Sequence, residues 1–358
     1  MRPLSAAPTA WQQLLACGRA GDFITAINFP LNVVLTRILP PFEAERFRLR
    51  YDSPYRQTDS GRGRRPQLRS VDLIGLALWY LKSSGSAQSM CPVFGLVPSS
   101  LNVWLSYSLE VLWRAVKDPS REAFAIRWPT EEEMRASSSL LERNREYGVV
   151  LKGIFGIMDG ARMPCADYTN KNIQNACYEG CACSEEVTNL FVFNFFGELI
   201  HAAVNFPGAW HDSRVAQTSG LPYPLLCDDR TPPGCAILLD SAFSNDITIT
   251  HGKIVRARKE GETEGIPESA ALAATDQLLQ RAMPSERQSA EWGVRAVKGP
   301  FGRLRVPLSA ISSKRLRILQ SCCHLYNLRT RYVGLNQIRT TYADKGSVTQ
   351  PWAQDLIG

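Results

Sequence analysis

Two apolar runs that each lead into an aspartate constrain this chain more than any other feature of its sequence. The first run, Val149–Met158, is followed by Asp159, and the second, Cys235–Leu239, is followed by Asp240. Apolar runs this short, bounded by turn residues, are typical of buried strands. An aspartate at the carboxyl end of such a strand projects into the crevice where α/β sheets bind ligands. The pattern therefore predicts an α/β domain in which carboxylates converge.

Further strand and helix patterns surround these two runs. We expect strands at Asn189–Phe196 and Glu198–Asn205, a short helix at Val215–Leu221, and helices at Glu268–Met283 and Ser285–Lys298. The spacing of apolar residues ahead of residue 146 is helical instead. The chain is therefore predicted to join a helical N-terminal domain to an α/β domain.

The N-terminal domain is expected to contain a helix-turn-helix unit. One or two helices in residues 1–45 should end at Pro40-Pro41, and Leu68–Leu81 should form another. In residues 86–117, a turn at Gly95 separates two helical patterns, and the second helix is expected to be capped by Ser99. That second helix carries no Lys or Arg over its first three turns, whereas recognition helices normally bring basic or amide side chains to DNA. Whether this unit reads DNA stays open.

Glu291 is the third candidate acid. It shares one face of its predicted helix with Arg287, Arg295 and Lys298. Two interpretations are open: a surface helix with ion pairs worth a few tenths of a kcal/mol each, roughly, or a metal-binding glutamate whose basic neighbours hold phosphates. Converging carboxylates repel one another, and a site with oxygen ligands alone suits Mg²⁺ or Mn²⁺ rather than zinc.

The charge of the chain is distributed unevenly. The net charge is +7, but residues 281–345 hold thirteen Lys and Arg against three acids, so the rest of the chain sums to −3. Such asymmetry indicates a polyanionic partner and argues against a small substrate, and a solvated basic face is the alternative interpretation. No run of about 18 apolar residues occurs, so no membrane-spanning helix and no membrane partner are expected.

The ten cysteines are expected to be reduced thiols of an intracellular protein, because no secretory signal pattern precedes them. Cys177, Cys181 and Cys183 lie close together but include no Cys-x-x-Cys pair and have no nearby histidine at finger spacing. This spacing does not favour zinc, and the role of the cluster stays open.

Four motifs in order carry a resemblance to a known family. They are Gly156-Ile157-Met158-Asp159-Gly160, Pro207-Gly208-Ala209-Trp210-His211-Asp212-Ser213, Leu239-Asp240-Ser241-Ala242-Phe243, and Arg287–Leu304 with Glu291 inside it. With a closing helix that contains His324 and Asn327, these segments resemble the PIF/Harbinger-type DDE transposases over about residues 150–340.

The resemblance implies an RNase H-like mixed sheet flanked by helices, with Asp159, Asp240 and Glu291 as the catalytic triad. These acids would hold two Mg²⁺ ions, or Mn²⁺ as a substitute, for phosphodiester hydrolysis and strand transfer. Asp212 is the competing second aspartate, and with His211 it is a secondary candidate. DNA contacts are expected from eight basic residues: Arg62, Arg64, Arg65, Arg287, Arg295, Lys298, Arg303 and Arg305.

This interpretation divides the chain at about residue 145. Residues 1–145 would be the helical domain with an Arg-rich loop, 146–340 the catalytic domain with an insertion at about 241–284, and 341–358 a tail. The implied partners are double-stranded DNA of transposon terminal repeats and target, a separate Myb-like DNA-binding protein, and further copies of the chain, in the nucleus. A domesticated DNA-binding protein that does not cut, and a metal-dependent phosphohydrolase of another substrate, are the alternatives.

Overall fold

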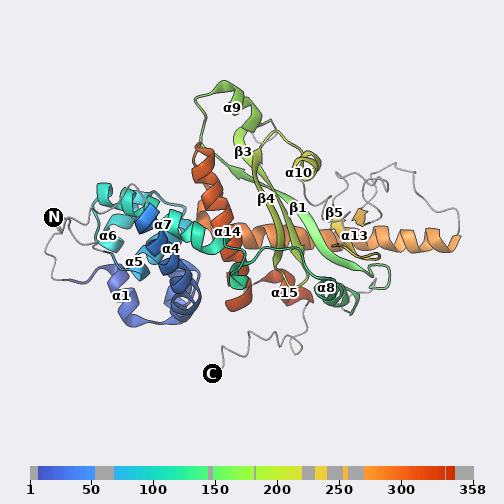
Figure 1. The fold of residues 1–358 in the computed structure, drawn as a ribbon. Coiled ribbons are helices and arrows are strands. Elements are labelled where there is room, and N and C mark those ends of the chain that lie inside the picture. Colours follow the sequence, from blue (N-terminus) through green and yellow to red (C-terminus); the bar gives the residue numbers. More distant parts are fainter. Residues whose placement is uncertain are drawn as a thin grey trace. The chain divides into compact units, whose positions relative to one another are not determined.

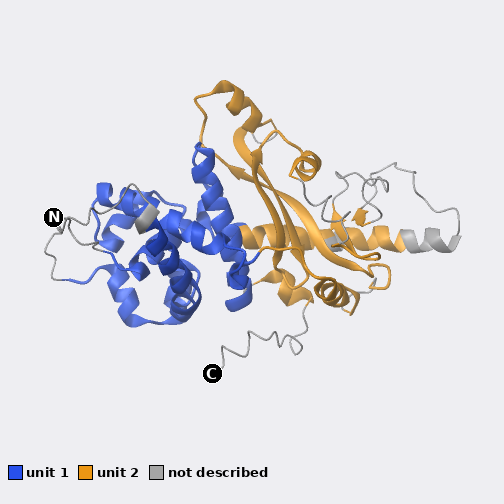
Figure 2. Ribbon diagram, viewed as in Figure 1, with its two compact units in different colours: residues 1–125, 298–334 blue, residues 126–297, 335–358 orange. Residues whose placement is uncertain are grey.

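The computed structural model divides the chain into two compact units (Figure 2). Unit 1 comprises residues 1–125 and 298–334, and unit 2 comprises residues 126–297 and 335–358. The structure describes residues 7–52, 68–143, 148–180, 183–219, 230–239, 253–256, 270–334 and 336–342. This division differs from the expected one at residue 145, because the basic segment after residue 297 belongs to the same compact unit as the N-terminal helices.

Unit 1 is helical throughout its described part (Figure 1). Its elements are α1 (Ala10–Cys17), α2 (Ala20–Ile27), α3 (Leu31–Val33), a π-helical segment η1 (Val34–Ile38), α4 (Leu39–Asp52), α5 (Ser70–Lys82), η2 (Ala87–Met90), α6 (Cys91–Phe94), α7 (Pro98–Lys117), η3 (Glu122–Phe124), η4 (Gly302–Arg305) and α14 (Ser312–Tyr332). The predicted helix at Leu68–Leu81 is confirmed as α5.

The helical path does not end at Pro40-Pro41, contrary to the sequence prediction. The chain passes from η1 directly into α4, and both prolines lie in the first turn of α4. A proline has no N–H to donate and its ring crowds the carbonyl four residues earlier. The wider π-helical turn that precedes the prolines changes the backbone pairing there, which allows the chain to stay helical.

The predicted helix-turn-helix segment forms helices, but its second helix begins differently from the expectation. Gly95 adopts the left-handed conformation (φ 64°) that ends α6. The chain then enters α7 with Pro98 in its first turn and Val97 as the cap, so Ser99 lies inside the helix. Proline is favoured at the first position of a helix because its fixed φ suits the helix and its missing N–H would be unpaired there.

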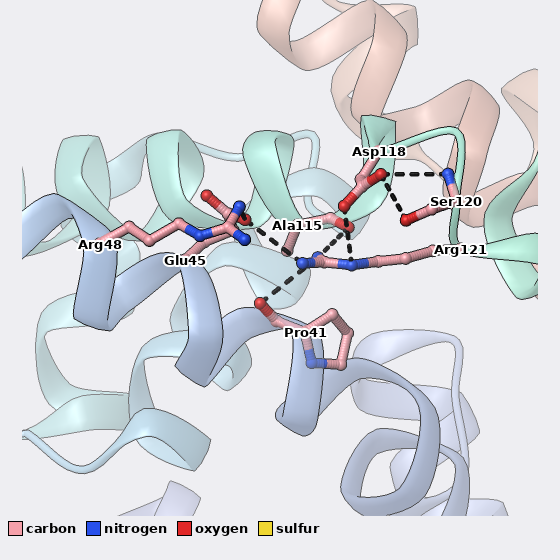
Figure 3. A network of polar contacts seen from close by, with 7 residues as sticks. All are labelled: Pro41, Glu45, Arg48, Ala115, Asp118, Ser120 and Arg121. Carbon is pink, nitrogen blue, oxygen red and sulfur yellow. Dashed lines mark hydrogen bonds and ion pairs between the residues drawn. The ribbon is translucent and has the colours of Figure 1, made fainter.

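A network around Arg121 joins α4 to the end of α7 (Figure 3). The Arg121 guanidinium donates hydrogen bonds to the carbonyl oxygens of Ala115 (2.6 Å) and Pro41 (3.4 Å). It also pairs with the carboxylates of Glu45 and Asp118, each at 3.3 Å. The Glu45 side chain is only 8% exposed, so Arg121 neutralises a buried charge as well as capping a helix.

Trp11 anchors α1 on α5 by lying across Gly75. A Cβ at Gly75 would stand 2.2 Å from the indole ring, so only glycine permits this approach. The indole Nε1 donates a hydrogen bond of 3.0 Å to Asp72, which Arg69 also contacts. Burial alone would raise the pKa of Asp72, but the hydrogen bonds from Arg69 and Trp11 outweigh it and lower that pKa.

The Gly75 contact gives a stability prediction with a matched control. Gly75→Ala should lower the free energy of unfolding by about 2 kcal/mol, because overpacking a buried ring outweighs the gain in helix propensity. Gly21→Ala, in the neighbouring α2, places its Cβ in open space and should raise that free energy by up to about 1 kcal/mol. Urea denaturation of the full chain measures both. A stabilised Gly75→Ala variant would contradict the packing described.

Unit 2 is built on a six-stranded mixed sheet (Figure 1). The strands in its described part are β1 (Ile154–Pro164), β2 (Tyr178–Glu179), β3 (Ser184–Asn194), β4 (Leu199–Pro207), β5 (Ala236–Leu239) and β6 (Ile254–Arg256). β1 pairs with β3, and β3 with β2 and β4, in antiparallel fashion. On its other side β1 pairs in parallel with β5, which pairs in parallel with β6. This mixed sheet agrees with the α/β class that the sequence analysis expects.

Helices cover both faces of this sheet. The helices of unit 2 in its described part are α8 (Glu131–Arg143), α9 (Lys171–Cys177), α10 (Asp212–Thr218), α13 (Ala270–Lys298, whose last residue falls in unit 1) and α15 (Gln337–Tyr342). On one face, Val215 and Ala216 of α10 pack with Met158, Val192 and Ile237. α13 passes behind the strands in Figure 1. It is one continuous helix of 29 residues, not the two helices that the sequence predicts on either side of Pro284.

No single helix in the described residues is long and apolar enough to cross a membrane. One pair, α2 and the helical segment Leu31–Leu49, meets the length and apolarity criteria only when taken together, and it is bent by 69°. Phe23, Ile27 and Val34 of this pair are fully buried within unit 1. Their apolar character is thus explained by the core of that unit.

Candidate functional site

Asp159 lies within β1 rather than at its end. The strand continues to Pro164, and Asp159 stands opposite Phe191 of β3 in the antiparallel ladder. The expectation of a strand that ends at Met158 was wrong, because pairing with β3 extends the strand past the apolar run. Side chains alternate along a strand, so Asp159 points to the face opposite to that of Met158 and Gly160. Its side chain is half-buried, and its Oδ1 accepts a hydrogen bond of 2.9 Å from the Gly160 N–H.

α13 packs on the same face of the sheet as Asp159. Gly293 of α13 is so close to Phe193 that a Cβ there would lie 2.6 Å from the ring. Phe193 stands opposite Ile157, which is two residues before Asp159 and therefore on its face. The sheet thus presents Asp159 on the side that carries the helix of Glu291. The sequence analysis missed Gly293, although a glycine inside an apolar helical stripe is a signal of close packing.

Glu291 lies on an exposed flank of α13. Ala290 and Gly293 are buried against the sheet, whereas the Glu291 side chain is 49% exposed. Arg295 pairs with it one turn later at 4.0 Å, and the Arg295 side chain is 76% exposed. A pair this exposed stabilises a helix by at most about 1 kcal/mol, so it leaves the carboxylate accessible to other ligands. Arg287 is also exposed and Lys298 is half-buried.

Asp212 belongs to the other face of the sheet. It is the first residue of α10, and a Cβ at Gly160 would lie 2.1 Å from its Oδ2, so its carboxylate sits directly over Gly160. Because Gly160 and Asp159 face opposite sides of β1, Asp212 does not share the Asp159 face. His211 is exposed, and its backbone carbonyl accepts the first hydrogen bonds of α10, from the N–H groups of Arg214 and Val215. Both residues therefore lie at the start of α10, and their secondary role in catalysis stays a prediction.

Asp240 lies outside the described residues, so the triad as a whole remains a prediction. Its neighbour Leu239 is the last residue of β5, and Leu238 stands beside Ile157 in the parallel ladder. β5 therefore approaches the part of β1 that holds Asp159. In the described ranges, no three His, Cys, Asp or Glu side chains gather as a metal site. The carboxylates of Asp159 and Glu291 are described and have access to solvent. Carboxylate oxygens are the ligands that Mg²⁺ and Mn²⁺ prefer.

Many bases of the cationic segment make contacts inside unit 1. Arg303 lies 4.1 Å from the Tyr80 ring centroid and donates to the Gly85 carbonyl at 2.7 Å. Arg305 is exposed and donates to the Gly299 carbonyl at 3.4 Å. The buried Arg315 donates to the Ser309 carbonyl at 2.8 Å. Part of the positive charge in residues 281–345 therefore holds the fold together, and only the exposed remainder is available to a polyanion. Arg62, Arg64 and Arg65 lie outside the described residues.

His201 of β4 and the cysteine cluster are also candidates. Burial lowers the pKa of His201 to about 4, and its Nε2 atom is buried without a hydrogen-bond partner in the described part of the chain. This histidine is therefore neutral near pH 7 and is unsuited to contact phosphate as a cation. Cys177 is buried and Cys183 is exposed, while Cys181 lies outside the described residues, so the cysteine cluster cannot be assembled into a site.

Comparison with known proteins bears on the segment that contains these acids. No curated protein and no solved structure matches the chain. A family model does match it, over residues 158–327, which is just under half of the 358 residues. The matched segment begins one residue before Asp159 and includes Glu291. Residues 158–327 are thus similar to the DDE superfamily endonucleases, a family of metal-dependent nucleases that act on DNA.

Proposed function

We propose that this protein is a metal-dependent DNA endonuclease of the PIF/Harbinger transposase type, which cuts phosphodiesters at transposon ends and joins them to target DNA. One observation carries the proposal: within the segment similar to DDE endonucleases, Asp159 and the helix of Glu291 lie on the same face of the sheet. The strand order, with three antiparallel strands followed by two parallel ones, agrees with an RNase H-like sheet.

In this proposal Asp159, Asp240 and Glu291 hold two divalent ions. Bound Mg²⁺ or Mn²⁺ would activate a water or a DNA 3′-hydroxyl and stabilise the leaving oxygen. Asp159 sits on a strand paired on both sides, and Glu291 on a helix seated by Gly293, so rigid elements position both carboxylates. The exposed guanidinium groups of Arg287 and Arg295 flank Glu291 and are placed to contact phosphates.

The wider assignments are proposals of the same kind. Transposon terminal repeats and target DNA would be the substrates, and a Myb-like protein would supply sequence-specific binding. The lack of charge in the first half of α7 agrees with dependence on such a partner. Action on chromosomal DNA in the nucleus as a homo-oligomer completes this assignment.

Nicking of supercoiled plasmid by the purified full chain tests the proposal. We expect nicks with 5 mM Mg²⁺ or Mn²⁺ (roughly the concentration that fills weak carboxylate sites) and none with a chelator. DNA binding with either metal but without nicking would support the domesticated, non-cutting alternative. Hydrolysis of a small phosphodiester such as bis-p-nitrophenyl phosphate, without plasmid nicking, would support the phosphohydrolase alternative.

A further inference from the structure

Basic side chains of two packed helices gather at Trp113 within unit 1. Trp113, Arg114 and Lys117 belong to α7, and Arg317 to α14. Lys314 lies about one turn before Arg317 on α14, on the same side of that helix. The indole Nε1 of Trp113 donates a hydrogen bond of 2.7 Å to Gln320, which fixes the ring between the two helices. The Lys117 Nζ lies 3.5 Å from the ring centroid and the Arg317 Cζ lies 5.6 Å from it. We call these five residues the Trp113 cluster.

The charges of the Trp113 cluster are only partly neutralised. Glu110 accepts an ion pair from Arg114 at 2.8 Å and another from Arg317 at 2.6 Å, so one carboxylate serves two guanidinium groups. Lys117 and Lys314 are exposed, and neither makes an ion pair with a carboxylate within the described residues. Four bases against one acid leave an excess of three positive charges on adjoining faces of two helices.

Helix stability does not account for the position of Lys314. It lies in the first turn of α14, where a cation opposes the helix dipole and costs a few tenths of a kcal/mol, roughly. Lys117 lies in the last turn of α7, where a cation is favourable for the dipole of that helix. Its Nζ is held over the indole ring of Trp113. An exposed cation kept at an unfavourable helix position indicates a role in binding an anion.

From this arrangement we infer that the Trp113 cluster binds the phosphate backbone of duplex DNA. The inference rests on the proposed function, which makes DNA the polyanion that this protein meets. It assigns the DNA contact to the C-terminal half of α7 together with α14, whereas a recognition helix usually contacts bases with its N-terminal residues. From Pro98 to Leu109, α7 carries no charged side chain. The contact is therefore made to phosphates and is independent of base sequence.

A binding titration with the full-length double variant Lys117→Gln/Lys314→Gln tests the inference. The probe is a fluorescein-labelled 30-bp duplex of arbitrary sequence at three salt concentrations, a length of about three turns that spans the surface of one such helix pair. Loss of two phosphate contacts should reduce the slope of log K against log salt by about 1.8, which weakens binding roughly fifty-fold near 0.1 M salt. An unchanged slope overturns the inference.

Two matched variants make the result specific. Arg19→Gln/Arg135→Gln removes the same charge from two exposed bases outside the cluster, and it should leave the slope as in the wild type. Lys117→Arg/Lys314→Arg keeps the charge and should also retain the slope. An equal fall of the slope in either control variant overturns the inference. In the Arg→Gln variant the fall would follow net charge alone, and in the Lys→Arg variant it would follow side-chain shape. Weaker binding of poly-glutamate with unchanged DNA binding would overturn it as well and indicate an acidic protein partner.

Plasmid nicking measured on the same preparations separates this inference from the proposed function. If the wild type does not nick but the slope of log K against log salt falls in the double variant as expected, the DNA surface stands and the nuclease assignment fails. If the wild type nicks and the slope is unchanged, the nuclease assignment stands and the surface fails.

Discussion

Replacing Asp159 by asparagine is expected to abolish Mg²⁺-dependent nicking while duplex binding stays near the wild-type level. The amide has the shape of the carboxylate but lacks the negative charge that a divalent ion needs. Loss of a residue that hydrogen-bonds to a metal ligand lowers metal affinity or activity about 10- to 100-fold. Loss of a direct ligand should therefore lower the nicking rate by more than 100-fold, roughly. Plasmid nicking and a gel-shift titration, run with the same protein, measure the two properties.

Two isosteric variants serve as controls for Asp159→Asn. Asp167 is exposed and lies in the same unit, so Asp167→Asn should nick at the wild-type rate. Asp212→Asn changes a carboxylate on the opposite face of β1 and should also keep nicking, provided that circular dichroism shows a folded protein. If Asp212→Asn is folded and inactive while Asp159→Asn is active, the assignment of Asp159 is wrong.

Replacing Arg121 by methionine should cause a large loss of stability in unit 1. Methionine keeps the apolar stem but removes the charge that faces Glu45, whose side chain is 8% exposed. It also removes the donors to the Ala115 and Pro41 carbonyls. Breaking a buried ion pair from one side typically costs 3–5 kcal/mol, and we expect about 3 kcal/mol because Glu45 keeps a second partner. Urea denaturation of the full chain measures the change.

That second partner, Arg48, supplies the matched control. It contacts the same Glu45 carboxylate at 2.9 Å (Figure 3), and its own side chain is 65% exposed. Exposed pairs contribute up to about 1 kcal/mol, so Arg48→Met should lower the free energy of unfolding by less than that. Equal losses of unfolding free energy in the two variants would show that the hydrogen bonds from Arg121 to the carbonyls, and its burial, do not stabilise the fold.

The local elements of this protein could be predicted from sequence where near neighbours along the chain decide them. The apolar spacing of α5 and the short apolar run of β5 gave their positions to within two residues. The order of acidic motifs led to the DDE superfamily, whose endonuclease model matches residues 158–327, while the PIF/Harbinger subtype stays a prediction. The boundaries failed where pairing or packing extends an element: β1 runs six residues past the predicted end because β3 pairs with it, and α13 continues through Pro284.

The sequence by itself determined which residue types carry the chemistry: acids after or within apolar strands, a glutamate on a basic helix, and a cationic C-terminal third. Only the tertiary structure decided which of them face one another. Alternation along β1 sends Asp159 to the side of α13 and leaves Asp212 over Gly160 on the other side. Packing of α14 on α7 likewise directs Arg317 to Glu110 and leaves Lys314 exposed. The physical reason is that the partner of a side chain is decided by the strand or helix that packs against its element. That packing element lies tens to hundreds of residues away in the sequence.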